Sequence, residues 1–223
     1  LGSSNGTFLD GRCLLGSTLL HDGARVRIGD FQCVFRQVRS PLAHRVADDP
    51  QVTVRDIQVA HCWFVIADIE GYSALTQSLP PEQLGRVVGV WVSACHGVID
   101  RRGGVLNKFL GDGFFAYWPD NPAGVRSLKD ALDDFLRMQA ANDPRFRLVV
   151  HRGLATFSGS LGGEVIIGTD VNFAFRMEKL AKNLGLNRLG SAPAREGLKG
   201  LTFRGAGRHP LPGFDGRHEF FTW

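Results

Sequence analysis

The sequence predicts an α+β protein in which a sheet packs against long amphipathic helices. Two observations carry this prediction. Apolar runs with strand character, such as residues 64–67, alternate along the chain with apolar residues at helical spacing, as in residues 80–101. The chain has 223 residues and is 43% hydrophobic, which is enough to bury a sizeable core in one domain or two.

The first part of the chain has the composition of a small all-β domain. Within residues 1–37, Asn-Gly and Asp-Gly turn signals recur, and residues 25–35 alternate as two paired strands would. Residues 38–58 are polar, contain two prolines and show no period, so we interpret them as a linker. A second domain is therefore expected over residues 59–223.

Strands and helices alternate in this second domain. The expected elements are, in order, a strand at 60–68, a helix at 80–101, a hairpin at 105–118, a helix ending near 142, strands at 146–151 and 164–167, and a helix at 168–184. The residues after 184 are expected to be irregular with short strands. This order predicts a ferredoxin-like βαββαβ arrangement with additional strands.

Two aspartates follow apolar strands in this pattern. The hairpin strands are joined by residues 111–113, a Gly-Asp-Gly turn in which both glycines permit positive φ and place Asp112 at an exposed tip. The strand at 64–67 likewise runs into Asp68. Each turn alone is most simply structural, but two carboxylates meeting across one sheet would hold a hard divalent cation.

A third polar feature lies on the predicted helix at 168–184. Asn172 and Arg176 are four residues apart, so they share one face near the helix N-terminus, which favours anions. An amide beside a guanidinium suits a sugar oxygen and a phosphoryl group. The alternative is a surface helix whose arginine pairs with Glu178 or with solvent.

Charge and cysteine content exclude several classes of function. The net charge of +4 is scattered, so we expect no nucleic-acid partner. The four cysteines are far apart and form no Cys-x-x-Cys, which argues against a zinc site or a disulfide framework and favours a reducing compartment. No apolar run approaches the roughly 20 residues that span a bilayer, so we expect a cytoplasmic protein with no membrane span.

The sequence of the first 37 residues also contains motifs of a known domain. Residues 2–8, the Asp-Gly at 22–23 and the Ile-Gly at 28–29 resemble the C-terminal half of a forkhead-associated (FHA) domain. The resemblance implies that a complete domain would bind a phosphothreonine protein, with Ser4 and Asn5 in a recognition loop. The half that supplies the phosphate-gripping arginine is missing here, so this function is expected to be vestigial in the fragment.

Three sequence segments in the second domain show a stronger resemblance. Residues 64–73, 108–113 and 168–178 together resemble the class III nucleotide cyclase catalytic domain, over residues 59–223. The resemblance implies a homodimer with active sites shared between protomers. It also implies adenylate cyclase activity, in which the ribose 3′-hydroxyl of ATP attacks the α-phosphate to give 3′,5′-cyclic AMP and pyrophosphate.

The same resemblance assigns roles on one side of the shared site. Asp68 and Asp112, helped by the Ile69 carbonyl, would bind two Mg²⁺ or Mn²⁺ per active site. The turn that follows would offer backbone N–H groups to the β- and γ-phosphates. The residues of that turn are Ile69, Glu70, Gly71 and Tyr72.

The other protomer would supply the remaining groups. Lys108 would read the purine, Asn172 would orient the ribose, and Arg176 would stabilise the α-phosphoryl charge. Val165 stands where the family usually has a hydrogen-bonding side chain, and it leaves the adenine amino group unpaired. Two alternatives therefore stay open: a catalytically silent nucleotide-binding or dimerisation module, and a purine-relaxed cyclase that uses GTP.

Overall fold

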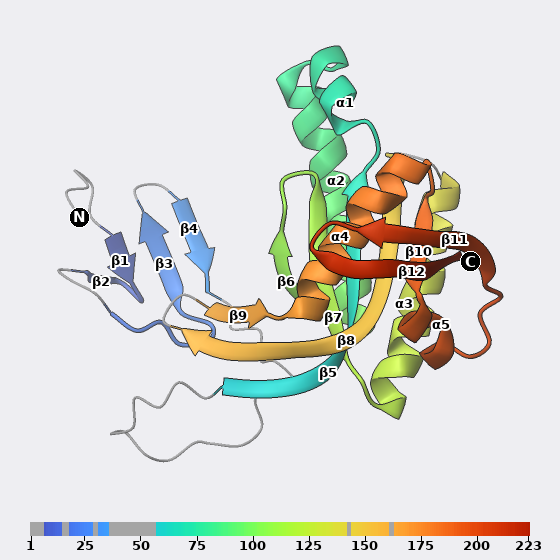
Figure 1. Ribbon diagram of the computed structural model, residues 1–223. Coiled ribbons are helices and arrows are strands. Elements are labelled where there is room, and N and C mark those ends of the chain that lie inside the picture. The colour runs from blue at the N-terminus through green and yellow to red at the C-terminus, as the bar shows by residue number, and fades with distance from the viewer. Residues whose placement is uncertain (1–6, 15–17, 29–30, 36–56, 142–143, 161–162) are drawn as a thin grey trace. The chain divides into compact units, whose positions relative to one another are not determined.

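The computed structural model describes residues 7–14, 18–28, 31–35, 57–141, 144–160 and 163–223 (Figure 1). The chain divides into two compact units, Leu1–Ala47 and Asp48–Trp223. The predicted loop residues Ser4 and Asn5, and all but the last two residues of the predicted linker at 38–58, lie outside the described residues.

The first unit contains a four-stranded antiparallel sheet, which confirms the strand pairing predicted from the alternation. Its strands are β1 (Thr7–Leu9), β2 (Arg12–Cys13), β3 (Arg25–Ile28) and β4 (Phe31–Val34), in the order β2-β1-β3-β4. Between β1 and β2, Asp10 and Gly11 have φ of 48° and 84°, as a tight two-residue hairpin turn requires. The FHA resemblance itself stays a prediction.

The second unit is built on an eight-stranded sheet with the order β11-β12-β10-β8-β5-β7-β6, and β9 pairs with β8. The strands are β5 (Ile57–Ile69), β6 (Val105–Phe109), β7 (Gly113–Pro119), β8 (Phe146–Ser160), β9 (Gly163–Ile167), β10 (Arg188–Ser191), β11 (Arg204–Leu211) and β12 (Phe214–Thr222). Only the β10–β8 pair is parallel among these pairings.

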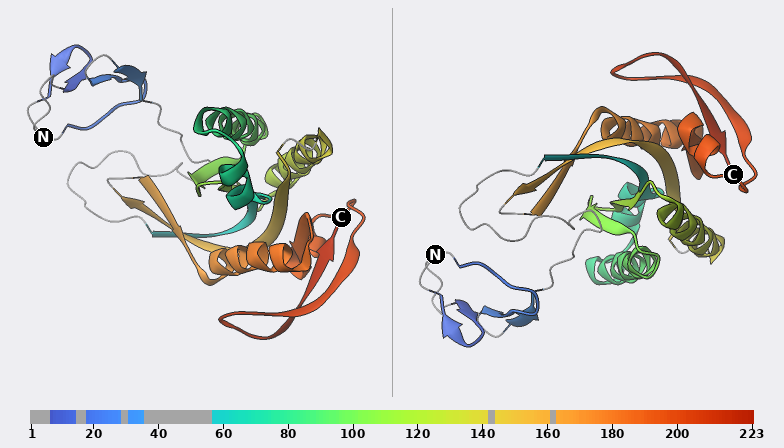
Figure 2. Two further views of the ribbon diagram at one scale, coloured as in Figure 1. Left: turned by 90° about the horizontal axis from the view of Figure 1, so that it is seen from above. Right: turned by 90° about the horizontal axis from the view of Figure 1, so that it is seen from below.

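Helices cover both faces of this sheet (Figure 2). They are α1 (Tyr72–Ser78), α2 (Pro81–Arg101), α3 (Pro122–Ala141), α4 (Thr169–Leu184) and α5 (Ala192–Gly197). Helices α2 and α3 share a core cluster with one face of the sheet, and α4 packs its aromatic residues against the other. Among the described residues, no helix combines the length and apolar character needed to cross a membrane.

The central strand β5 shows why the two faces are both apolar. Trp63 and Val65 belong to the cluster with α2 and α3, whereas Phe64 contacts Phe115 and so lies on the α4 face. Residues 62–67 are all at most 2% exposed. A strand that is buried on both faces has a continuous run of apolar residues, and this segment of the sequence is such a run.

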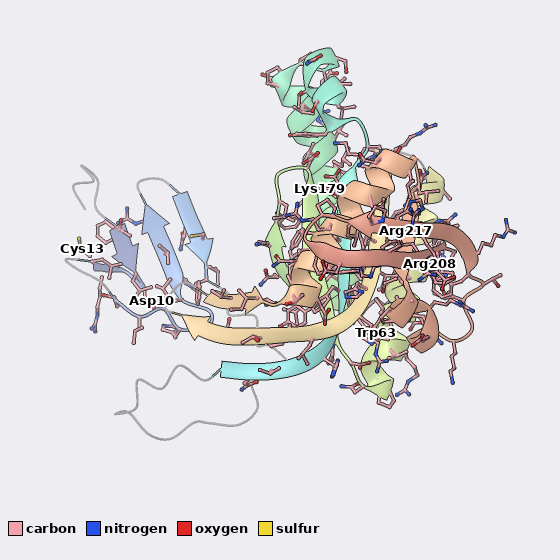
Figure 3. The ribbon with its side chains drawn as sticks, in the orientation of Figure 1. Asp10, Cys13, Trp63, Lys179, Arg208 and Arg217 are labelled. Atoms are coloured by element: carbon pink, nitrogen blue, oxygen red, sulfur yellow. The ribbon has the colours of Figure 1, made fainter. Side chains whose placement is uncertain are left out.

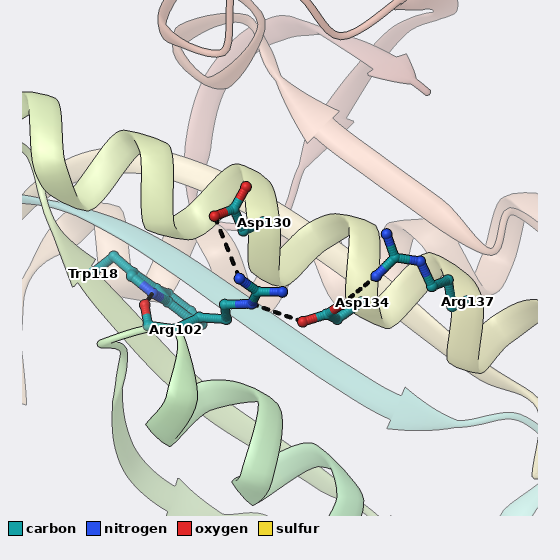
Figure 4. A network of polar contacts seen from close by, with 5 residues as sticks. All are labelled: Arg102, Trp118, Asp130, Asp134 and Arg137. Atoms are coloured by element: carbon teal, nitrogen blue, oxygen red, sulfur yellow. Dashed lines mark hydrogen bonds and ion pairs between the residues drawn. The ribbon is translucent and has the colours of Figure 1, made fainter.

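A polar network fixes the end of α2 against α3 and β7 (Figure 4). Arg102 donates to Asp134 at 2.8 Å, and the indole N–H of Trp118 donates to the Arg102 carbonyl at 2.9 Å. Gly103, with φ of 61°, follows the last turn of the helix in the left-handed conformation that commonly ends a helix. The following Gly104 leaves room for Trp118, whose ring would lie 2.4 Å from an added Cβ. This packing anchors the β6–β7 hairpin that bears Asp112.

Two expectations about secondary structure are wrong. The strand predicted at 146–151 continues to Ser160, because the Ser- and Gly-rich stretch pairs with β5 on one side and β9 on the other. After residue 184 strands do occur, as expected, but the segment is not irregular, because β10 and the β11–β12 hairpin extend the sheet and α5 lies between them in the chain. Helix α1 was not predicted either.

Candidate functional site

The backbone brings Asp68 and Asp112 together at one end of the β5–β7 pair. Asp68 stands opposite Gly113 in the antiparallel register, and the Ile69 N–H donates to the Asp112 carbonyl at 3.0 Å. The turn is closed by the Leu110 N–H, which donates to the Gly113 carbonyl at 2.8 Å. The structure therefore places both predicted carboxylates on adjacent strand ends.

The two glycines that flank Asp112 have different roles. Gly111 has φ of 73°, the left-handed conformation that was predicted for it. Gly113 does not have positive φ, which corrects the prediction that both glycines serve the turn in this way. A Cβ at Gly113 would instead lie 2.4 Å from the Ala67 carbonyl oxygen and 3.3 Å from Asp68 Oδ1. Glycine is needed there for close strand approach, and Asp112 is half-buried rather than at an exposed tip.

The carboxyl group of Asp68 is strongly perturbed by this setting. Burial, followed by the nearby charges of Asp112 and Glu178, raises the pKa of Asp68 to about 7. Burial also raises the pKa of Glu178, which lies on α4. Lys182 and Arg147 act in the opposite direction on both groups and only partly compensate. The site therefore gathers more carboxyl groups than cations at partly buried positions.

Arg147 on β8 lies beside two carboxyl groups, Asp68 and Glu70. Its guanidinium lies 4.0 Å from Asp68 and 3.9 Å from Glu70, and its side chain is 12% exposed. Neither Glu70 Oε1 nor Arg147 Nε has a hydrogen-bond partner, although both atoms are buried. Unsatisfied buried polar atoms are costly, so this edge of the sheet has unused capacity to bind a polar ligand.

The donor set fits a hard divalent cation. Carboxylate oxygens are the ligands that Mg²⁺ and Mn²⁺ prefer, and a cation would offset the burial and the repulsion by Asp112 and Glu178 that raise the pKa of Asp68. No group of three or more His, Cys, Asp or Glu side chains arranged for a metal occurs in the part of the chain that the structure describes. The fit therefore rests on the pair Asp68 and Asp112, with backbone or ligand oxygens completing the coordination.

The turn after Asp68 offers fewer free N–H groups than the sequence predicts. The Ile69 N–H is used by Asp112, and the Glu70 N–H donates to the Arg145 carbonyl at 2.8 Å. Gly71 adopts φ of 65° at the start of α1, and the half-buried Tyr72 packs against the core. Of the four predicted N–H contacts to phosphate, those of Gly71 and Tyr72 are the ones that remain compatible with the backbone.

A second group of predicted residues gathers around the first half of α4. Lys108 Nζ lies 5.8 Å from the ring centroid of Phe175, which packs on Phe115 of the sheet. Asn172 and Arg176 are exposed on the same helix, and Lys179 follows them on the exposed surface (Figure 3). Val165 is 46% exposed on β9.

These two groups face different directions within one chain. Residues on an α-helix are separated by about 100° each, so Arg176 points about 200° away from Glu178, which faces Asp68. No hydrogen bond or ion pair links Asp68 or Asp112 to Lys108, Asn172 or Arg176 in the described ranges. The predicted residues therefore form two separate groups within one chain, and each group would be one half-site of a shared site.

Comparison with known proteins identifies the architecture. No protein-family model matches the chain. A curated adenylate cyclase from Anabaena cylindrica is 27% identical over an alignment of 142 residues, which covers 56% of this chain and 28% of that protein. The chain therefore matches little more than a quarter of that relative's length.

Solved structures share the architecture at low sequence identity. A bacterial light-regulated adenylyl cyclase has a TM-score of 0.62 at 23% identity, over 76% of this chain and 53% of that chain. Adenylyl cyclase CyaB from P. aeruginosa has a TM-score of 0.60 at 20% identity, over 75% and 95%. The guanylate cyclase domain of RhGC from Catenaria anguillulae, in complex with GTP, has a TM-score of 0.62 at 16% identity, over 74% and 96%. The fold is that of nucleotide cyclase catalytic domains.

The sequence analysis did not predict three charged residues that surround Asp68. Arg147, Glu178 and Lys182 all act on Asp68, but none received a site role. A signal for Arg147 was present, because it is the one charged residue between Phe146 and His151 in an otherwise apolar strand. The direction in which Glu178 faces depends on how α4 lies on the sheet, which no local pattern reports.

Proposed function

We propose that residues 59–223 form an adenylate cyclase catalytic domain that converts ATP to 3′,5′-cyclic AMP and pyrophosphate for intracellular signalling. The observation that carries the proposal is the partly buried acidic pair, Asp68 and Asp112, at adjacent strand ends of a cyclase fold. Attack of the ribose 3′-hydroxyl on the α-phosphorus is intramolecular, so the protein needs only to orient the groups and stabilise charge.

Asp68 and Asp112, with the Ile69 carbonyl, would hold two Mg²⁺ or Mn²⁺ in each active site. Bound there, the cations would supply activation of the 3′-hydroxyl and neutralisation of the pyrophosphate charge. Arg147 contributes a fixed positive charge beside Asp68 and Glu70 that limits the repulsion among the carboxylates. The N–H groups of Gly71 and Tyr72 would contact the β- and γ-phosphates.

The second half-site would bind the nucleoside and the α-phosphate. The Lys108 ammonium only donates, so it suits the N1 acceptor of adenine and is mismatched to the N1–H of guanine. Asn172 would orient the ribose, and Arg176 would stabilise the charge that grows on the α-phosphoryl group. Because Arg176 faces away from Asp68 within one chain, a second copy would complete each site, as in a homodimer with two shared sites.

Val165 favours a second candidate function. Its apolar, partly exposed side chain accepts no hydrogen bond from the adenine amino group. The domain would then be a purine-relaxed cyclase that also uses GTP, or a catalytically silent module that binds nucleotide and dimerises. Substituting Val165→Thr restores an acceptor of nearly the same shape and should raise the ratio of ATP to GTP turnover by about tenfold if this pocket is dry.

The deciding experiment measures cyclic nucleotide formation from ATP and, separately, from GTP, with Mn²⁺, at protein concentrations high enough to dimerise. Asp68→Ala removes one carboxylate of the acidic pair. Asp100→Ala, an exposed carboxylate on α2, is the matched control. We expect cyclic AMP from the wild type and from Asp100→Ala, and none from Asp68→Ala.

Other outcomes separate the candidates. Comparable turnover of GTP would establish the purine-relaxed cyclase. Nucleotide binding without any cyclic product from a dimeric wild type would exclude catalysis and support the silent module. Equal activity of Asp68→Ala and wild type would overturn the assignment of the acidic pair.

A further inference from the structure

A buried histidine links the helix of the second half-site to the sheet. His151 on β8 is 4% exposed. Its Nδ1 lies 2.7 Å from Ser191 Oγ, and its Nε2 lies 3.7 Å from Asp170 Oδ1 in the first turn of α4. The Nε2 atom has no hydrogen-bond partner at this separation. The His151 side chain on β8 therefore faces Ser191 at the end of β10 and Asp170 on α4.

Asp170 is held by β8 through its other oxygen as well. The Leu154 N–H donates to Asp170 Oδ2 at 2.6 Å. A Cβ at Gly153 would lie 2.4–2.5 Å from Asp170 side-chain atoms, so glycine is required for this close approach. The residue before the helix, Gly168, provides no side-chain cap. The first turn of α4 therefore depends on Asp170 and its contacts with β8.

Ser191 joins His151 to helix α5. Ser191 Oγ already accepts from the Ala194 N–H at 3.2 Å, where it caps α5. The same hydroxyl lies 2.7 Å from His151 Nδ1, and it donates or accepts there according to the tautomer of the imidazole. Ser191 thus connects His151 to the start of α5, while His151 Nε2 faces Asp170 of α4 at 3.7 Å.

Aromatic packing restricts the imidazole ring itself. The centroid of Phe173, on α4, lies 4.8 Å from that of His151, and the centroid of Phe64, on β5, lies 6.2 Å from it. The ring is held between a strand and the helix that it contacts through Asp170. Its position and that of the first turn of α4 are therefore coupled.

We propose that His151 is a positioning residue that fixes the first turn of α4, and with it Asn172 and Arg176, for the reaction. The proposal rests on the proposed cyclase function. Asn172 and Arg176 are exposed, and the described part of the chain holds neither side chain by a hydrogen bond or ion pair. Their placement is consequently inherited from the helix, and the helix start is set by Asp170 and His151.

Three variants test this role. His151→Phe keeps a flat ring between Phe64 and Phe173 but removes both nitrogens. His151→Gln retains a donor that can face Asp170. The matched control is Arg152→Gln on the next residue of β8, which breaks a 2.7 Å ion pair with Asp120 that does not involve α4.

The experiment measures kcat and KM for ATP with Mn²⁺, together with hydrogen–deuterium exchange of the amides of the first turns of α4. We expect His151→Phe to lower kcat about 10- to 100-fold with a smaller change in KM, because Arg176 acts on charge that develops in the transition state. His151→Gln should recover part of the kcat. Exchange at residues 169–174 should accelerate in His151→Phe and not in Arg152→Gln.

Two results would overturn the positioning role of His151. Wild-type kcat and wild-type exchange in His151→Phe would overturn the positioning role. A loss of kcat in Arg152→Gln as large as that in His151→Phe would reduce the effect to general destabilisation and also overturn it. If the wild type forms no cyclic nucleotide, the proposed function fails, while the exchange comparison still decides whether His151 fixes α4.

Discussion

At the scale of single residues, the pKa of Asp68 near 7 predicts how cation binding depends on pH. Below pH 7 the carboxyl group is protonated and must release its proton to bind Mn²⁺, so affinity should rise from pH 6 to pH 8. Isothermal titration calorimetry in buffers of different ionisation enthalpy should show proton release at pH 6 that disappears by pH 8.

The same shift sets the sign of the stability change without metal. A carboxyl whose pKa is raised on folding contributes stability below its unfolded pKa, near 3.8, and loses that contribution as pH rises through 7. Metal-free wild type should therefore lose stability between pH 5 and about pH 8, and Asp68→Asn should lose less. A pH-independent Mn²⁺ affinity would contradict the raised pKa.

Arg147 gives a second prediction at this scale. Arg147→Met keeps the apolar stem and removes the charge that lies about 4 Å from Asp68 and Glu70. Because the remaining carboxylates are partly buried, we expect the free energy of unfolding without metal to fall by about 3 kcal/mol. Saturating Mn²⁺ should recover more stability in this variant than in the wild type.

Thermal or chemical denaturation with and without Mn²⁺ measures this effect. Arg126→Met, on the exposed surface of α3, is the matched control and should change stability little. Equal losses in the two variants would show that Arg147 does not balance the acidic group.

At the scale of elements, the β6–β7 hairpin depends on two glycines for different reasons. Gly111→Ala meets no atom within 4 Å but must adopt φ of 73°, which costs about 1 kcal/mol. Gly113→Ala would place its Cβ 2.4 Å from the Ala67 carbonyl and separate β5 from β7. We expect Gly113→Ala to cost more stability and to weaken Mn²⁺ binding, whereas Gly111→Ala should largely keep binding. The reverse order would refute the close-approach argument.

The elements also show what the sequence could predict. Helix α2 and the strand pair β5–β7 follow directly from apolar spacing, because their burial pattern is local. The second half of β8 does not, because its serines and glycines become a strand only through pairing with β5 and β9. The positions of Asp68 and Asp112 could be predicted because each follows an apolar strand. The proximity of Glu178 to Asp68 could not be predicted, because it depends on how α4 packs on the sheet.

At the scale of the whole molecule, the two half-sites predict that activity requires two copies. Apolar side chains on β5, β8 and β9 are exposed in one chain, namely Val59, Leu154, Val165 and Ile167. Asp68 and Arg176 face different directions in the same chain. If the sites are shared, a defect in one half-site can be compensated by a partner that carries an intact one.

This argument gives a complementation test. Asp68→Ala and Arg176→Ala, each inactive alone, are co-expressed with different tags, and the doubly tagged dimer is isolated. One of its two sites draws its acidic pair and its arginine from intact halves, so about half of the wild-type activity should return. A dimer of Asp68→Ala with Asp112→Ala should stay inactive, because both changes damage the same half-site. Absence of recovery in the first dimer would show that each chain forms its site alone.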